Sequence, residues 1–165
     1  MKLPIAFYRR DNVVSLSRDF LGKVLYSRLD GNVTAGIITE TEAYNGISDK
    51  ASHAFGGRRT SRTEIMYAPG GLAYVYLCYG IHSLFNIVTG KKDVPQAILV
   101  RAVYPIVGEE AMRLRRRRPG SATAELCIGP GTVTQALGIH YSDTGKDLRG
   151  DEIWIEDKKI KIPLN

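Results

Sequence analysis

The stretch TETEAYNGISDKASH, residues 39–53, carries the pattern from which the fold of this chain can be worked out. It continues a run of β-branched residues that starts at Val33, directly after the turn sequence Asp30-Gly31-Asn32. Such a turn between apolar runs is a strong hairpin signal. We therefore predict that Val33–Tyr44 is a strand and that it pairs with a preceding strand at Lys23–Leu29.

The chemistry of this stretch lies on one side of the predicted strand. Side chains on a strand alternate between its two faces, which places Glu40, Glu42 and Tyr44 together. Two interpretations are open. The glutamates belong to a solvated strand face, or they provide a carboxylate base at the strand's end, where Asn45-Gly46 breaks the pattern and the floor of a cleft can begin.

A second stretch, LAYVYLCYGIHSLFN at residues 72–86, is rich in tyrosine and predicts another hairpin. Two strands flank a glycine-containing turn, Leu72–Leu77 and Ser83–Thr89. Tyr74 and Tyr76 then share one face, and Tyr79 stands beside the turn, where an aromatic ring is unusual unless it packs on something or enters something. The alternative for each tyrosine is core packing or a cross-strand pair.

The segment Asn45–Gly71, which joins the two hairpins, is polar, glycine-bearing and arginine-rich. It is too long for a simple connection, so we expect it to carry function. Its single histidine, His53, gives no reason by position alone to be more than a surface residue. Three arginines are spaced along this loop and can bind the phosphates of a nucleic acid, namely Arg58, Arg59 and Arg62.

A cation lies in the middle of an apolar strand predicted at Gln96–Tyr104. Arg101 has apolar neighbours on both sides in the sequence and therefore needs a partner. Glu42 or Glu40 can serve. A structural ion pair explains this arrangement as well as a catalytic one does.

Three helices and a last strand complete the prediction. Their ranges are Asn12–Leu21, Glu109–Arg117 and Thr132–Leu137 for the helices and Glu152–Glu156 for the strand. The third helix follows Gly129-Pro130-Gly131, and the free backbone N–H groups at its start suit a phosphate.

The 165 residues suffice for one domain with a buried core. The net charge of +6 hints at a polyanionic partner. A second basic cluster, Arg113 with Arg115–Arg118, is open to two interpretations, a solvated helix end or a phosphate-binding surface.

Other classes of protein find little support. No window reaches the roughly 18 apolar residues of a membrane span and no signal peptide is recognisable, so we expect a cytoplasmic protein, nucleoid-associated if the source is bacterial. Cys78 and Cys127 form no CxxC pair, which argues against a disulfide framework. The three histidines lack HExxH spacing, which leaves metal catalysis poorly supported.

Five ordered blocks are ETEAY at 40–44, His53 eleven positions after Glu42, YVYLCYG at 74–80, Asn86, and LVRAVYP at 99–105. Together they resemble the alkyladenine (3-methyladenine) DNA glycosylase family, over about residues 16–154. The resemblance implies an α+β fold, a single mixed domain with a curved antiparallel β-sheet and peripheral helices. It also implies a monomeric enzyme without a cofactor that acts on double-stranded DNA containing damaged purines.

The resemblance further implies a base-excision-repair glycosylase that flips alkylated or deaminated purines out of the duplex. These purines are 3-methyladenine, 7-methylguanine, hypoxanthine and ethenoadenine. Glu42 would activate the water that breaks the N-glycosidic bond, and Arg101 would help to hold that water. Tyr79 would fill the gap that the flipped base leaves in the stack.

By the same resemblance, Tyr44 and His53 would stack on one side of the flipped base and Tyr76 on the other, with a cation–π contribution for N-alkylated purines. Asn86 would discriminate against normal guanine by a clash with its exocyclic amine. Phosphate contacts would come from Arg58, Arg59, Arg62 and Gly131. No lysine matches a Schiff-base role, so a monofunctional enzyme without lyase activity is expected.

The chain departs from the family pattern in three places. Ser61 and Thr63 stand where the family's arginine loop has Pro and Asn, and Thr132 follows GPG where the family often has lysine. Relatives continue with an R-x-G-x-x-x-A-G-E block and a PWRFY-like strand. We therefore expect residues 1–165 to form one DNA glycosylase domain that is C-terminally short and lacks the family's last strands.

Two other functions are weighed against this one. A non-catalytic damaged-DNA-binding relative, disabled by the C-terminal truncation, would bind lesions without releasing the base. A carbohydrate hydrolase with Glu40 and Glu42 as its two carboxylates is disfavoured, because residues two apart on one strand face are roughly 7 Å apart and do not flank a sugar from opposite sides.

Overall fold

A turn at Asp30-Gly31 sets the first hairpin of the structure, a computed structural model that describes residues 1–160. Both turn residues have positive φ, 52° and 81°, as a type I′ turn requires. Leu29 lies opposite Asn32 in the register of the two strands, which are β1 (Val24–Leu29) and β2 (Asn32–Asn45). The predicted hairpin is confirmed, and its second strand is one residue longer at each end.

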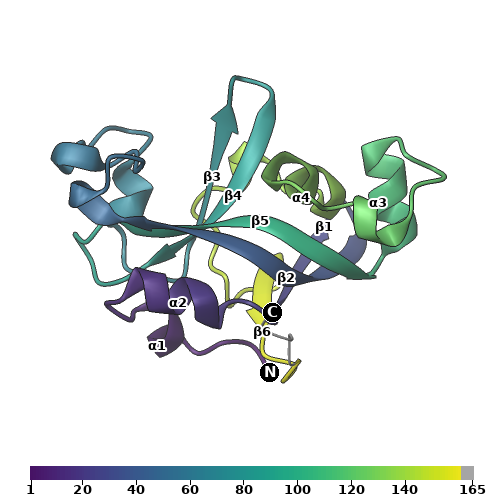
Figure 1. The fold of residues 1–165 in the computed structure, drawn as a ribbon, viewed down its shortest axis with the longest axis horizontal. Coiled ribbons are helices and arrows are strands. Elements are labelled where there is room, and N and C mark those ends of the chain that lie inside the picture. Colours follow the sequence, from purple (N-terminus) through teal and green to yellow (C-terminus); the bar gives the residue numbers. More distant parts are fainter. Residues whose placement is uncertain (161–165) are drawn as a thin grey trace.

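In the described part of the chain, six strands form one sheet in the order β3-β4-β5-β2-β1-β6, and all neighbouring pairs are antiparallel. The sheet curls strongly and helices surround it (Figure 1). The predicted α+β class, with a curved antiparallel sheet and peripheral helices, is therefore confirmed. The four remaining strands are β3 (Ala73–Cys78), β4 (His82–Thr89), β5 (Gln96–Val107) and β6 (Ile153–Glu156).

Strand β5 extends further than its sequence pattern predicts. The prediction ends at Tyr104, whereas the strand continues through Pro105 to Val107. Proline has no N–H to donate to a sheet ladder and is tolerated where the ladder is irregular. The register of β2 and β5 shifts between Ala35 and Gly36, where Gly36 faces Pro105, and this irregularity accommodates the proline.

Within residues 1–160, four α-helices accompany the sheet. They are α1 (Ile5–Tyr8), α2 (Val13–Asp19), α3 (Glu109–Arg116) and α4 (Pro130–Leu137). Asn12 caps α2 rather than beginning it, because its side chain accepts a hydrogen bond from the backbone N–H of Ser15 at 2.9 Å. The pattern did not predict α1, whose four residues are too few to establish a helical period.

The two faces of the sheet pack against different parts of the chain. One face, with Val75, Ile87 and Ile98, forms the larger core together with apolar residues of all four helices. The other face, with Tyr74 and Val88, packs against residues such as Met66 from the segment between β2 and β3. The aromatic residues of interest therefore lie between the sheet and this segment.

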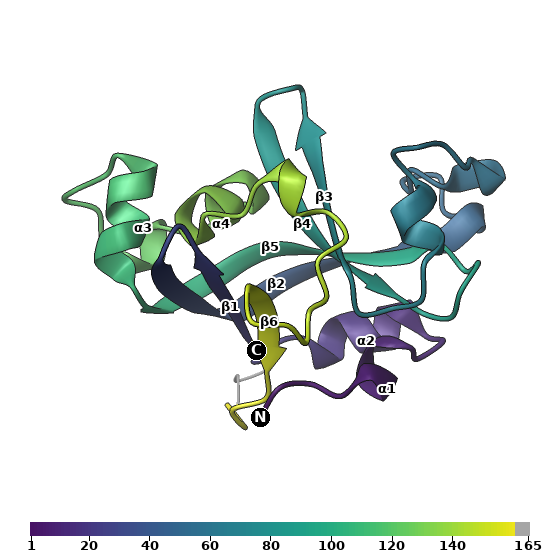
Figure 2. The same cartoon turned by 180° about the vertical axis from the view of Figure 1, so that it is seen from behind.

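The segment between β2 and β3 consists of turns and short 3-10 helices, at Gly46–Ser48, Phe55–Gly57 and Glu64–Tyr67. It forms a lobe at one end of the sheet (Figure 1). Seen from behind in Figure 2, the same lobe lies beside the β3–β4 hairpin, whose tip projects away from the rest of the sheet. The lobe and the hairpin together frame the candidate site.

Candidate active site

Four side chains of the site lie in one row across the sheet. Tyr74 pairs with Asn86 in the β3–β4 register, Asn86 with Leu99 in the β4–β5 register, and Leu99 with Glu42 in the β5–β2 register. Residues directly opposite each other in an antiparallel sheet point to the same face. The sheet thus brings Glu42 onto the face that carries the tyrosines, although the two stretches lie far apart in the sequence.

Arg101 lies at a β-bulge next to this row. Val100 pairs with Thr41 and Ala102 with Glu40, so Arg101 has no partner of its own in the register. Bulges re-aim a side chain and are frequent beside active sites. Nε of Arg101 donates to Oε1 of Glu40 at 2.8 Å, and Nη1 donates to Oε2 of Glu42 at 2.7 Å. Sequence alone left either glutamate as the partner, and the structure gives both.

A small cavity opens on the same face of the sheet. Its volume is about 60 Å³, well below the roughly 150 Å³ of a cavity that takes up benzene. A purine is larger than benzene, so its entry requires side chains to move. The cavity is lined by Tyr44, Ala51, His53, Met66, Tyr74, Tyr76, Asn86 and Ala97.

The rings around the cavity touch one another. The rings of His53 and Tyr76 meet edge to face, with their centroids 4.6 Å apart and their planes at 80°. Nδ1 of His53 lies within hydrogen-bond distance of the Tyr74 hydroxyl, at 2.9 Å. The structure thus brings His53, Tyr44, Tyr76 and Asn86 together in the lining of one cavity. It adds Tyr74, whose place on the same strand face as Tyr76 was a signal for it in the sequence.

Asn86 is fully buried, and its side-chain amide is fixed by the backbone. Nδ2 donates to the carbonyl oxygens of Tyr74 and Leu84, each at 3.2 Å. Both hydrogens of the amide are therefore used in the wall of the cavity. This determines which edge of the side chain faces the cavity.

Protonation states in the cavity follow from burial. Burial raises the pKa of Tyr76 to about 12, and burial, with Glu42 nearby, raises the pKa of Tyr44. For His53, burial first and then the positive charges of Arg62 and Arg58 lower the pKa below 6.5. Burial also raises the pKa of Tyr74. At neutral pH the walls thus carry three neutral phenols and a neutral imidazole.

The three arginines of the lobe have different surroundings. The guanidinium of Arg62 lies over the ring of Tyr76, 5.1 Å from its centroid. Arg59 is held by Glu64 at 2.7 Å and by Asp93 at 3.0 Å, and these carboxylates raise its pKa. Arg58 is exposed. Arg59 thus has a structural role that the sequence did not reveal, whereas the charges of Arg58 and Arg62 act on the cavity residue His53.

The tip of the β3–β4 hairpin presents Tyr79 to solvent. Its side chain is 92% exposed and its φ is 52°, in the left-handed region that bulky residues rarely adopt. Gly80 follows with φ 69°, and the N–H of Ile81 donates to the carbonyl of Cys78 at 3.1 Å, which closes a tight turn. Ile81, which sequence reasoning missed, is 74% exposed. An aromatic ring held outward at a backbone cost is a candidate functional feature.

The start of α4 lies against this hairpin. A groove of about 330 Å³ runs between the hairpin and the start of α4, and Tyr79, His82 and Gly131 line it. A Cβ at Gly131 would be 3.3 Å from His82, so glycine permits the close approach. Thr132, which follows Gly129-Pro130-Gly131, exchanges hydrogen bonds with the backbone of Gly129 and caps the helix.

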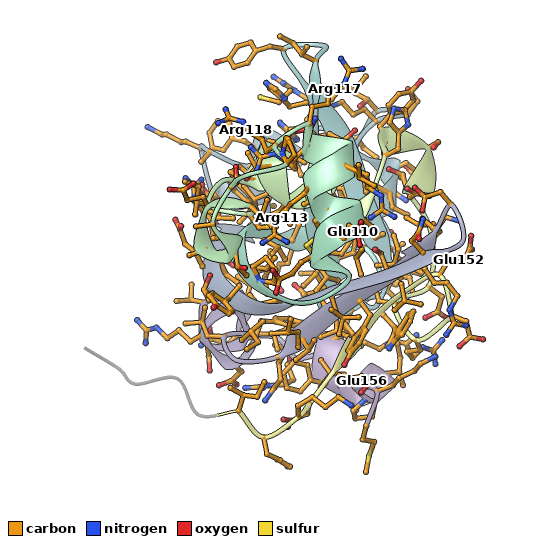
Figure 3. All side chains as sticks on the ribbon, turned by 90° about the vertical axis from the view of Figure 1, so that its right-hand side faces the viewer. Glu110, Arg113, Arg117, Arg118, Glu152 and Glu156 are labelled. Atoms are coloured by element: carbon orange, nitrogen blue, oxygen red, sulfur yellow. The ribbon has the colours of Figure 1, made fainter. Side chains whose placement is uncertain are left out.

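The second arginine cluster divides into two groups. Arg113, Arg115 and Arg116 bind carboxylates or carbonyl oxygens within the fold; Arg115, for example, donates to Asp30 at 2.6 Å. Arg117 and Arg118 are exposed, and no ion pair involves them within residues 1–160. Figure 3 shows Arg117 at the end of α3 on the same side of the molecule as the hairpin tip.

Two further properties concern residues 1–160. Every helix in this range is too short to cross a bilayer. His, Cys, Asp and Glu side chains in the same range nowhere gather in threes that could hold a metal ion.

The chain belongs to the methylpurine-DNA glycosylase family, whose model matches residues 6–163. It is 47% identical to a protein of Chlamydia abortus, with 96% of this chain and 83% of the relative aligned. Identity is 44% to a protein of Chlamydia felis (96% and 81%) and 42% to one of Clostridium acetobutylicum (96% and 80%). Each of these relatives is provisionally named a 3-methyladenine DNA glycosylase.

The fold and the family membership together define a DNA-repair enzyme, a DNA glycosylase associated with alkylation damage. DNA is therefore its substrate. The suspected family resemblance is confirmed.

Proposed function

We propose that this protein is a monofunctional purine-specific glycosylase that flips damaged purines out of duplex DNA and hydrolyses their N-glycosidic bond. The observation that carries the proposal is the position of Glu42. It lies in one row of the sheet with Asn86 and Tyr74, which line the aromatic cavity, and it contacts Arg101 at 2.7 Å. The purines proposed are 3-methyladenine, 7-methylguanine, hypoxanthine and ethenoadenine.

Tyr79 is proposed as the wedge that replaces the flipped base. A base inside a duplex hides its glycosidic bond, so the enzyme must extrude the nucleotide and fill the vacancy. The ring of Tyr79 projects from a narrow hairpin that can enter a groove, and its exposed neighbour Ile81 adds apolar surface beside it. The tight turn fixes the backbone from which the ring projects before DNA binds.

Tyr44, His53 and Tyr76 are proposed to hold the flipped base. Neutral, electron-rich rings suit N-alkylated purines, whose positive charge gains roughly 0.5–2 kcal/mol from cation–π contacts. A base stacked between two rings needs about 7 Å between them, twice the contact distance of carbon atoms. Because His53 and Tyr76 are 4.6 Å apart, a base between this pair must separate them. Asn86 then discriminates against guanine by excluding its exocyclic amine.

The chemical step is hydrolysis. The oxygen of a water forms a bond to C1′ of the sugar as the bond from C1′ to the base nitrogen breaks, and the electron pair of that bond leaves with the base. The water proton passes to the Glu42 carboxylate, and Arg101 helps to hold the water. A cationic alkylated base leaves as a neutral molecule, whereas a neutral lesion such as hypoxanthine must also acquire a proton.

The phosphates flanking the lesion are proposed to contact both sides of the hairpin. The charges of Arg58 and Arg62 act on the cavity residue His53, Arg62 lies over the ring of Tyr76, and Gly131 lines the groove beside the hairpin tip. Arg59 contributes less, because a phosphate must compete with its two carboxylates. On the other flank, the exposed Arg117 and Arg118 extend the basic surface.

The test is single-turnover base release from duplexes that contain hypoxanthine or 3-methyladenine. We expect release by the parent protein. Glu42→Gln should bind the same duplexes within about twofold and release base at least roughly a hundredfold more slowly. Glu152→Gln, which alters an exposed carboxylate in an ion pair with Lys146, is the matched control and should behave as the parent. Binding without release by the parent would instead indicate a non-catalytic damaged-DNA-binding protein.

A further inference from the structure

Glu40 binds the catalytic arginine on the edge that does not face Glu42. Nε of Arg101 donates to Oε1 of Glu40 at 2.8 Å, while only Nη1 reaches Oε2 of Glu42, at 2.7 Å. We propose that Glu40 is a positioning residue that holds Arg101 in a single-contact pair with Glu42 and so keeps the second oxygen of Glu42 free for the nucleophilic water. This inference rests on the proposed function.

The reason lies in the usual geometry of these groups. Arginine and a carboxylate commonly pair through two parallel N–H to O bonds. Such a bidentate pair with Arg101 would engage both oxygens of Glu42. Here Glu40 engages Nε, and Arg101 uses Nη1 but not Nη2, and binds Oε2 of Glu42 but not Oε1. The Tyr44 side chain also interacts with the Glu42 carboxylate, but Arg101 leaves one of its two oxygens without a guanidinium contact. One oxygen can then accept a water proton while a neighbouring N–H binds the water oxygen.

The backbone is shaped for this arrangement. Two irregularities in the β2–β5 register flank Glu40, between Ile38 and Glu40 and between Glu40 and Thr41. They leave Arg101 without a partner opposite it and place its guanidinium between two carboxylates of one strand. A regular ladder would give Arg101 one facing residue rather than two glutamates.

Stability gives no comparable reason for the arrangement. The side chains of Arg101, Glu40 and Glu42 are 37%, 55% and 40% exposed. Ion pairs this exposed contribute little to folding. Glu40 is also the first cause of the raised pKa of Arg101, so the guanidinium interacts at least as strongly with Glu40 as with Glu42. A role in positioning Arg101 therefore explains why this arginine pairs with both glutamates, whereas a contribution to folding stability does not.

Removal of the Glu40 charge should release the guanidinium to turn onto Glu42. The Glu42 carboxylate would then lose its free oxygen and part of its basicity while remaining in place. A small displacement of a reacting group commonly costs a large factor in rate. The expected effect is therefore on the chemical step and not on DNA binding.

The experiment measures single-turnover base release against enzyme concentration for Glu40→Gln. We expect the maximal rate to fall about tenfold or more, with the half-saturating enzyme concentration unchanged within about twofold. Glu40→Asp, which keeps the charge, should recover much of the rate. The matched control is Glu152→Gln, which alters an exposed carboxylate in an ion pair away from the site and should leave the maximal rate as in the parent.

A double-mutant cycle tests whether Glu40 acts through Arg101. Once Arg101 is replaced in Arg101→Lys, Glu40→Gln should have little further effect on the maximal rate. An equal loss in both backgrounds, or a parental rate in Glu40→Gln, would overturn the inference while the parent's activity upheld the proposed function. Absence of base release from the parent would overturn the proposed function and this inference with it.

Discussion

Nδ1 of His53 and the hydroxyl of Tyr74 lie 2.9 Å apart and join the lobe between β2 and β3 to the sheet. The imidazole is half-buried, and burial, then Arg62 and Arg58, lower its pKa. The ring that this contact holds is therefore neutral where the enzyme is expected to work. The contact lies in the wall of the cavity, so the protonation state of His53 sets whether Nδ1 can accept from the Tyr74 hydroxyl or only donate to it.

Stability should consequently depend on pH through His53. Its folded-state pKa lies below the 6.5 of the free side chain, so the unfolded chain takes up the proton first as the pH falls. The free energy of unfolding is then unaffected by this group above pH 6.5 and decreases as the pH falls from 6.5 to the folded-state value. Urea unfolding at pH 7.5 and pH 5 should show a smaller difference for His53→Gln than for the parent.

The control for this experiment is His140→Gln, which removes an exposed histidine outside the cavity. It should leave the difference between the two pH values closer to that of the parent than His53→Gln does. If His53→Gln and the parent lose the same stability on acidification, the assigned neutral state is wrong.

Replacement of Tyr79 should separate function from stability. Tyr79→Gly removes the ring and relieves a left-handed conformation that costs a non-glycine residue about 1–2 kcal/mol. The free energy of unfolding should stay level or increase by up to about 1 kcal/mol. Binding to a lesion duplex should weaken by about tenfold or more, since stacking of a base on an aromatic ring is worth roughly 1–3 kcal/mol.

Tyr79→Phe is the matched variant, because it keeps the ring and loses only the hydroxyl. It should bind lesion duplexes nearly as the parent does. A glycine variant that binds and excises at the parental level would remove Tyr79 from the proposed interface.

Salt dependence should distinguish the free arginines from the structural ones. The logarithm of the association constant for B-DNA falls linearly with the logarithm of the salt concentration, and each phosphate contact contributes about 0.9 to this slope. The double variant Arg117→Ala/Arg118→Ala should therefore reduce the slope by up to roughly 2 units and leave the maximal rate of base release unchanged.

The control is Arg9→Ala/Arg18→Ala, which removes two exposed arginines from the region of α1 and α2, on the side of the molecule away from the hairpin tip (Figure 1). It has the same change in net charge, so a contribution from net charge alone would affect both double variants equally. Equal slopes for the two double variants would mean that α3 does not contact the duplex.

Replacement of Asn86 should change both the free energy of unfolding and the discrimination against undamaged guanine. Asn86→Ser removes a buried amide that donates to two carbonyl oxygens, and each buried acceptor left without a donor costs about 1–3 kcal/mol. It also removes the proposed obstacle to guanine, so release of undamaged guanine should increase over the parent. Thr89→Val is the stability control, because the buried hydroxyl of Thr89 has no hydrogen-bond partner within residues 1–160.

Much of the fold could be predicted because its signals are local. Asp30-Gly31 specifies the first hairpin, and Tyr79-Gly80 occupies the turn of the second. The alternation of side chains correctly placed Tyr74 and Tyr76 on one face. The extension of β5 through Pro105 was missed, because tolerance of a proline depends on the irregular register of a partner strand and not on the proline's neighbours in sequence.

The sequence by itself determined where the strands lie, apart from the extension of β5, together with the two hairpins and the resemblance that names the candidate residues. Each of these depends on residues close along the chain or on a fixed order of short blocks. Only the tertiary structure decided which charges are free. Arg115 binds Asp30, 85 positions away, and Arg101 binds two glutamates some 60 positions away because of a bulge. A charge finds its partner across the folded chain, and spacing in sequence does not encode that distance.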